Sequence, residues 1–132
     1  MYTSAATVDE LIRLAFDPGL MQDVVDLAGQ ALACEGRLFD NGRTFSAVAY
    51  GENPLPSPGY ENAGLVNITA QKNYIALYIY DFSSGNDCMA QYADVIPKTA
   101  RGKGCIRIRN ADFLGKYREA IAAILAGYRD SV

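Results

Sequence analysis

Three tyrosines share one side of a short stretch that could form a binding surface. The stretch reads NYIALYIYDF, and its tyrosines alternate with isoleucine, leucine and one alanine. Successive side chains of an extended strand point to opposite faces. Ile75, Leu77 and Ile79 therefore lie on one face, and Tyr74, Ala76, Tyr78 and Tyr80 lie on the other. Tyrosine joins a large apolar ring to a polar hydroxyl and is enriched at surfaces that bind a partner. The stretch therefore predicts a strand with one core face and one tyrosine face.

Two arginines could add an anion-binding function to this face. Residues 98–109 hold five basic residues and no acidic one. Within them Arg107 and Arg109 lie two positions apart in CIRIR, so a strand would place them on one side, about 7 Å from each other. Paired guanidinium groups bind carboxylate or phosphate well. The ordinary alternative is a solvated basic edge of the domain.

The same alternation assigns two faces to the whole predicted sheet. The core face is expected to hold mostly aliphatic residues: Phe45, Ala47, Ala49, Val66, Ile68, Ile75, Leu77, Ile79, Ile106 and Ile108. The opposite face is expected to hold Thr44, Ser46, Val48, Tyr50, Leu65, Asn67, Thr69, Tyr74, Tyr78, Tyr80, Cys105, Arg107 and Arg109.

The candidate binding residues on the second face are Tyr50, Tyr74, Tyr78, Tyr80, Arg107 and Arg109. They could bind a small anionic molecule or a protein partner, or form the interface of a homodimer. The face could also be exposed without a function, or be covered by the proline-rich loop at residues 51–63. An excess of tyrosine alone does not separate these alternatives.

Catalytic residues are not evident in the sequence. The chain has no histidine, which excludes catalytic triads with a histidine base and metal sites with histidine ligands. Cys88 lies near the expected start of a helix, where the helix dipole favours a thiolate, but Asp87 beside it opposes that charge. Cys34 and Cys105 are expected to be packing residues. We therefore expect a protein that is not an enzyme.

Carboxylates on the second predicted helix suggest a possible metal site. Asp23 and Asp26 lie three residues apart on its polar side, and oxygen-rich patches can hold hard cations such as iron. Ordinary solvation of a helix surface is the alternative. The stretch Gly102-Lys103-Gly104 lacks the spacing of a phosphate-binding loop, so no nucleotide cofactor is expected.

The size and composition of the chain favour one soluble domain. It has 132 residues and a net charge of −3, and half of its residues are hydrophobic. The isoelectric point of about 4.8 argues against general nucleic-acid binding. The apolar runs are too short for a membrane span, no signal peptide is recognisable, and three cysteines without a CxxC spacing suit reduced thiols. The expected location is the cytoplasm.

The order of predicted elements indicates an α+β fold. Apolar periodicity and breaking residues predict helices over about 7–16, 20–34, 88–95 and 110–128, and strands over 44–50, 64–70, 74–80 and 105–109, with a hairpin turn at residues 71–73. Three consecutive strands favour antiparallel pairing. The expectation is a two-layer domain over residues 1–132, with a mainly antiparallel sheet of about four to five strands and helices packed on one face.

Three sequence stretches together resemble a known family. They are Ala49-Tyr50-Gly51, NITAQKNYIALYIY at residues 67–80, and GKGCIRIRN at residues 102–110 before an amphipathic helix. Over about residues 44–128 this combination resembles the YdhG-like family of small bacterial domains of unknown function. The resemblance implies a compact α+β domain. One branch of the family is described as frataxin-like intracellular iron chaperones, so iron binding by acidic residues is implied as an alternative function.

Overall fold

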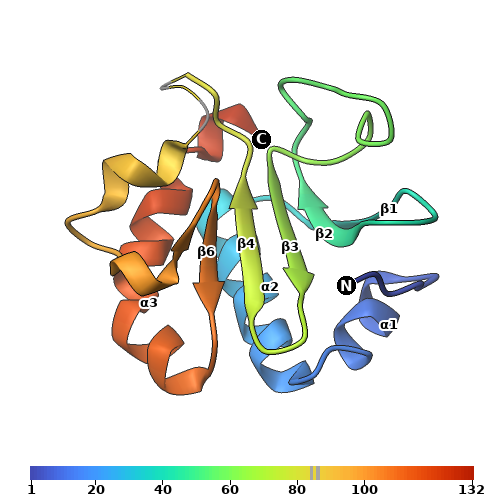
Figure 1. The fold of residues 1–132 in the computed structure, drawn as a ribbon, viewed down its shortest axis with the longest axis horizontal. Helices are drawn as coiled ribbons and strands as arrows, with labels where there is room; N and C mark the ends of the chain where they lie inside the picture. Colours follow the sequence, from blue (N-terminus) through green and yellow to red (C-terminus); the bar gives the residue numbers. More distant parts are fainter. Residues whose placement is uncertain (84, 86) are drawn as a thin grey trace.

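A computed structural model describes residues 1–83, 85 and 87–132, which form a sheet with helices packed on one side (Figure 1). The six-stranded antiparallel sheet has the order β1-β2-β3-β4-β6-β5. Its strands are β1 (Arg37–Asp40), β2 (Ser46–Tyr50), β3 (Val66–Ala70), β4 (Ile75–Ile79), β5 (Arg101–Gly102) and β6 (Cys105–Ile108). The α-helices are α1 (Val8–Arg13), α2 (Pro18–Leu32) and α3 (Ala111–Ala126). The predicted fold class is confirmed, with more strands than expected.

Helix α2 begins and ends at local sequence signals. Asp17 caps its first turn, because its carboxylate accepts a hydrogen bond of 3.1 Å from the backbone N–H of Leu20, and Pro18 occupies the first helical position. Ala33 ends the helix in the left-handed conformation at φ 51°. The apolar face of α2 packs on the sheet and on α3, so this helix forms the centre of the helical layer.

Helix α3 covers the other end of the sheet (Figure 1). The side chain of Asn110 caps it by accepting a hydrogen bond of 2.8 Å from the backbone N–H of Phe113. The helix predicted over about 88–95 is a 3₁₀ helix, η1 (Cys88–Tyr92), followed by turns. Two further 3₁₀ segments are η2 (Lys98–Ala100) and η3 (Arg129–Ser131). No α-helix in the described part of the chain is long and apolar enough to cross a membrane.

The core lies between the helices and one face of the sheet. A row of paired residues crosses four strands on this face, and each member is fully buried: Val48, Ile68, Leu77 and Ile106. Burial of a side chain of this size contributes about 1.5–3 kcal/mol. The predicted core residues of β3, β4 and β6 are therefore correctly placed.

The predicted faces of β2 are reversed. Val48 pairs with Ile68 and Tyr50 with Val66, so both point toward the helices, and the Tyr50 hydroxyl donates a hydrogen bond of 2.9 Å to the carbonyl oxygen of Val25 in α2. Ala47 and Ala49 consequently face away from the helices. The stretch SAVAY is apolar at both parities, and the large ring of Tyr50 fills the core better than alanine does. Tyr50 is thus excluded from the outer face.

Two other residues expected on the outer face also contribute to packing elsewhere. Leu65, just before β3, belongs to the main core, and Ser46 is buried with its hydroxyl donating a hydrogen bond of 2.6 Å to the carbonyl oxygen of Thr3. The register places Asn67, Tyr78 and Cys105 side by side on the outer face, as predicted. The sidedness expected for β3, β4 and β6 is confirmed.

Candidate binding site on the outer face of the sheet

Six aromatic rings form a continuous surface on the outer face, which we call the aromatic array. Neighbouring ring centroids lie 5.7–6.3 Å apart, within the range of favourable aromatic pairs. The array consists of Phe39, Phe45, Tyr60, Tyr78, Tyr80 and Phe82. Only Tyr78 and Tyr80 among them were expected at the site.

Small residues beneath the rings allow the array to form. Ala47 and Ala49 lie within β2 and Ala76 within β4, and none of them is exposed to solvent. Their short side chains leave room for the large rings of neighbouring positions to lie over the sheet. Phe39, Ala49 and Ala63 therefore form a second, small core on this side, separate from the core under the helices.

The proline-rich loop covers one end of the array. The Arg37 guanidinium holds the loop by donating hydrogen bonds of 2.8 Å to the carbonyl oxygen of Gly51 and 3.0 Å to that of Asn62. Tyr60 packs its ring 5.7 Å from that of Phe45. The expected possibility that the loop covers this face is thus realised at the Phe45 end, while Tyr78 at the centre remains partly exposed.

Arg107 lies at the opposite side of the array, over Tyr74. Its guanidinium carbon is 5.7 Å from the centre of the Tyr74 ring, a distance typical of a cation–π contact. Among the described residues, its buried Nε has no hydrogen-bond partner. Arg107 is half-buried, whereas Arg109 is exposed beyond the end of β6. Joint binding of an anion by the two arginines remains a prediction.

Tyr78 and Tyr80 are neutral at physiological pH. Burial raises the pKa of Tyr78 above its usual value and raises the pKa of Tyr80 to about 12. Neutral phenols keep their hydroxyls as hydrogen-bond donors. The array therefore offers apolar surface and hydroxyl donors, with positive charge supplied by Arg107 at its edge.

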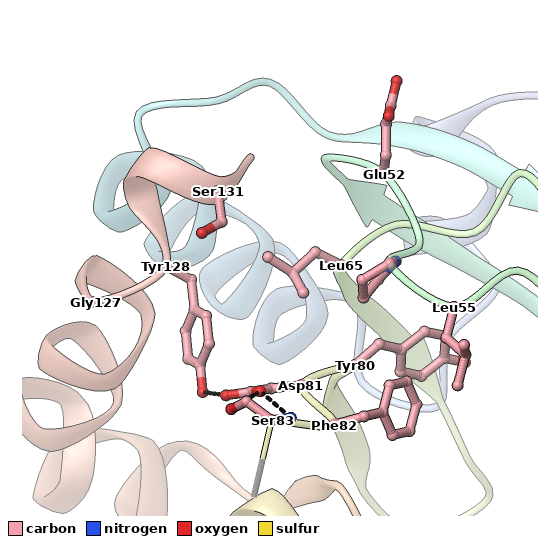
Figure 2. A pocket seen from close by; sticks show the side chains of 11 residues that line it. Glu52, Leu55, Leu65, Tyr80, Asp81, Phe82, Ser83, Gly127, Tyr128 and Ser131 are labelled. Atoms are coloured by element: carbon pink, nitrogen blue, oxygen red, sulfur yellow. Dashed lines mark hydrogen bonds between the residues drawn. The ribbon is translucent and has the colours of Figure 1, made fainter.

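Cavities open where β4 ends. Tyr80 and Phe82 line three of them, and the largest has a volume of about 540 Å³. We call it the β4-end cavity (Figure 2). Its lining consists of Glu52, Pro54, Leu55, Leu65, Tyr80, Asp81, Phe82, Ser83, Gly127, Tyr128 and Ser131.

Asp81 is the centre of a hydrogen-bond network in this cavity. One carboxylate oxygen accepts from the Tyr128 hydroxyl at 2.7 Å, and the other accepts from the Ser83 hydroxyl at 2.6 Å and backbone N–H at 3.0 Å. The bonds from Ser83 and then Tyr128 hold the pKa of Asp81 below its usual value. The Tyr92 and Tyr128 hydroxyls lie 3.0 Å apart, and burial together with these bonds strongly raises the pKa of Tyr128.

The sequence alone does not point to this network. Asp81 and Phe82 belong to the stretch NYIALYIYDF, but Tyr128 was expected only at the end of the helix predicted over about 110–128. The side chains of Asp81 and Tyr128 meet across 47 residues of sequence. A polar residue immediately after a strand was the available signal, because loops at strand ends often carry binding residues.

The predicted acidic site does not form a cluster of metal ligands. Asp23 and Asp26 are both exposed on α2, and Asp26 accepts a hydrogen bond of 2.9 Å from Gln22. Within residues 1–83, 85 and 87–132, no three Cys, Asp or Glu residues come together in a group that could hold a metal ion. Iron binding remains a prediction without a structural observation that favours it.

The cysteines differ in exposure. Cys88 and Cys105 are buried, and burial raises the pKa of both thiols. The Cys88 thiol lies 3.4 Å from the carbonyl oxygen of Ile79, to which it donates. The position of Cys88 near a helix start suggested a stabilised thiolate, but the structure does not support this. The effect of burial on the thiol pKa outweighs the effect of a short 3₁₀ helix.

This difference predicts a simple thiol titration. In the native protein, Ellman's reagent should modify one thiol, the half-buried Cys34, while Cys88 and Cys105 react at least about tenfold more slowly because they are buried and protonated. Cys34→Ser should remove the fast phase, and denaturant should expose all the remaining thiols. A fast phase that survives Cys34→Ser would contradict the assignment.

Comparisons with known proteins identify no relative for this arrangement. Searches against protein-family models, curated proteins and solved structures found no match. The resemblance to the YdhG-like family remains a prediction from the sequence motifs.

Proposed function

We propose that the protein is a non-enzymatic binding domain that holds a small aromatic anion on the outer face of its sheet. The ring system of the ligand lies against Tyr78 and its aromatic neighbours, and its negative group lies at Arg107. The observation that carries the proposal is the aromatic array, which continues from the loop-covered Phe45 to the partly exposed Tyr78 and Tyr80.

The chemistry of the face favours a flat ligand with a negative charge. Aromatic side chains supply broad apolar contact with little conformational entropy to lose, and an offset or edge contact with another ring adds about 0.5–1.5 kcal/mol. The guanidinium of Arg107 already stacks on Tyr74, which orients it along the face. A guanidinium has five N–H donors, so the terminal nitrogens of Arg107 can bind an anion on the outer face while its Nε is buried.

A matched pair of probes tests this proposal. The ¹⁵N NMR spectrum of the protein is titrated with 2-naphthoate and with neutral 2-naphthalenemethanol, which has a similar ring system. We expect naphthoate to bind more tightly and to shift resonances of β4 and β6. Arg107→Gln should weaken naphthoate binding by about 10- to 100-fold, the range for loss of a charge-assisted hydrogen bond of about 1.5–3 kcal/mol.

Other arginine variants separate a local contact from the effect of net charge. Arg109→Gln tests the second predicted arginine, and Arg118→Gln, exposed on α3, is the matched control. Arg118→Gln should leave naphthoate affinity unchanged. Equal weakening by Arg107→Gln and Arg118→Gln, or absence of shifts on the sheet, would overturn the proposal.

A further inference from the structure

The β4-end cavity differs in chemistry from the site at Arg107. Much of its lining is apolar: Leu65 is buried and Tyr80 partly buried, while Leu55 and Phe82 are exposed (Figure 2). Leu55 is 62% exposed and Phe82 is 43% exposed, which is high for large apolar side chains beside a cavity. The apolar lining could therefore bury further surface if an apolar group entered.

The charges of this lining are negative. Asp81 and Glu52 supply two carboxylates, and the described lining residues include no lysine or arginine. Asp81 is held by the neutral donors Ser83 and Tyr128, which orient its carboxylate without neutralising its charge. Glu52 stands at the rim, where its carboxylate points away from Asp81 (Figure 2).

Asp81 can accept one more hydrogen bond. A carboxylate offers about four lone-pair positions, and three donors from Ser83 and Tyr128 already occupy positions on its two oxygens. The remaining position lies on the oxygen that faces Tyr128. Because Asp81 is only partly buried, a ligand donor can reach it from the cavity. A positively charged donor would satisfy both the remaining lone pair and the negative charge.

We propose that the β4-end cavity binds a small organic ammonium ion. The ammonium group donates to Asp81, and the apolar body lies against Tyr80 and Phe82, whose ring centroids are 6.3 Å apart. Neutral aromatic rings attract a nearby cation through their negative faces. This site is separate from the proposed anion site: it takes the opposite charge, and it lies beyond the other end of β4 from Tyr74.

An inorganic cation fits this cavity less well. Hard cations take six or more oxygen ligands, whereas the described residues bring no three metal-binding side chains together here. The apolar walls would contribute nothing to such an ion. An organic ammonium ion uses the carboxylate and the rings together, and its hydrogen bonds match the lone pair that Asp81 has left.

Two isosteric probes test the proposal on the complete protein. Phenethylammonium and 2-phenylethanol differ mainly in the ammonium or hydroxyl group, and each is titrated by ¹⁵N NMR. Phenethylammonium should bind at least tenfold more tightly than the alcohol and shift resonances of Tyr80, Phe82 and Tyr128. Phenethylammonium binding should persist as the pH is lowered and should be lost only when Asp81 becomes protonated. The pKa of Asp81 lies below its usual value, so this loss requires acidic conditions.

Matched carboxylate variants locate the effect. Asp81→Asn should weaken phenethylammonium binding at least tenfold and leave the alcohol unchanged. Glu52→Gln removes the same charge at the rim and should change affinity less than threefold. Equal binding of the two probes to the wild-type protein, no binding of either, or equal effects of the two variants would overturn the proposal. If Asp81→Asn does not fold, the comparison of phenethylammonium with 2-phenylethanol on the wild-type protein still tests the proposal. The result does not depend on whether naphthoate binds at Arg107.

Discussion

Tyr50→Ala is expected to lower the free energy of unfolding by about 3–5 kcal/mol, the usual cost of deleting a buried aromatic ring. Tyr50 is fully buried, and its hydroxyl is bonded to the carbonyl oxygen of Val25 in α2. Deleting the ring removes its apolar contacts and leaves a cavity between β2 and α2. Urea denaturation followed by circular dichroism measures this change.

Tyr50→Phe separates the hydroxyl from the ring. The hydroxyl donates to the carbonyl oxygen of Val25, so its loss should cost only about 0.5–1.5 kcal/mol. Burial also raises the pKa of Tyr50 well above its usual value, so the hydroxyl remains a donor through the physiological range. A small effect of Tyr50→Phe beside a large effect of Tyr50→Ala would show that ring packing dominates.

Tyr78→Ala provides the comparison across the sheet. Tyr78 is half-buried on the outer face, so its removal should cost less than about 2 kcal/mol, because less of its surface leaves water on folding. If Tyr50→Ala and Tyr78→Ala destabilised the protein equally, the assignment of Tyr50 to the core would be wrong. A small loss of stability for Tyr78→Ala would fit a binding surface on the outer face. A loss as large as that for Tyr50→Ala would instead indicate a second core there.

The difference between these tyrosines shows what the sequence could predict. In β4, isoleucine and leucine alternate with tyrosine, so hydrophobicity alone orients the strand, and the structure confirms that orientation. In β2 the stretch SAVAY has apolar residues at both parities. Only its pairing with β3, which places Val48 opposite Ile68, decides which side faces the helices. Pairing between strands is tertiary information that alternation within one strand does not contain.

Two strands were missed for a related reason. β1 has four residues and contains two charged ones, and β5 has only two residues, Arg101 and Gly102. Segments this short carry too few alternations to show a period. Both lie at the edges of the sheet, where short strands are common because they limit pairing with other chains. Helices α2 and α3 and strands β3 and β4 were predictable because each carries several apolar residues at a regular period.

The candidate site was predictable only in part. Tyr74, Tyr78, Tyr80 and Arg107 lie on the outer face as expected, because β4 and β6 fix them through local alternation. Tyr60 reaches the array from a loop, and Asp81 meets Tyr128 from a distant helix end. These contacts depend on how the loop and α3 close against the sheet. A strand pattern therefore predicts which residues share a face but not which distant residues complete a site.

Opposite charges thus lie near the two ends of a single strand, Arg107 on the outer face and Asp81 beside Tyr128 at the end of α3. Arg107 accompanies Tyr74 at the start of β4, and Asp81 follows its end. The aromatic rings of Tyr78 and Tyr80 lie between them. If both proposed sites bind ligands, naphthoate and phenethylammonium should bind at opposite ends of β4. Their charges are opposite, so they do not repel each other, and each should shift NMR resonances at its own end of the strand.

Gly64→Ala is expected to destabilise the protein by about 3 kcal/mol, the upper end of the usual cost of overpacking. A Cβ at Gly64 would lie 2.5 Å from the backbone oxygen and 2.6 Å from the backbone nitrogen of Tyr50, and 2.8 Å from the oxygen of Val66. Backbone atoms cannot rotate away as a side chain can. The buried Asn67 side chain also holds Gly64 by two hydrogen bonds of 2.8 Å, so a shift of Gly64 would disturb both.

Gly115→Ala is the matched control, because it adds the same methyl group where there is space. Gly115 is exposed within α3, and its Cβ would meet no atom within 4 Å. Alanine forms helix better than glycine, so this change should raise the free energy of unfolding by about 0.5–1 kcal/mol. Urea denaturation of both variants should therefore give changes of opposite sign. If Gly64→Ala left the free energy of unfolding unchanged, the segment that joins the loop to β3 would be able to move away from Tyr50. The close approach of Gly64 to Tyr50 would then not constrain the fold.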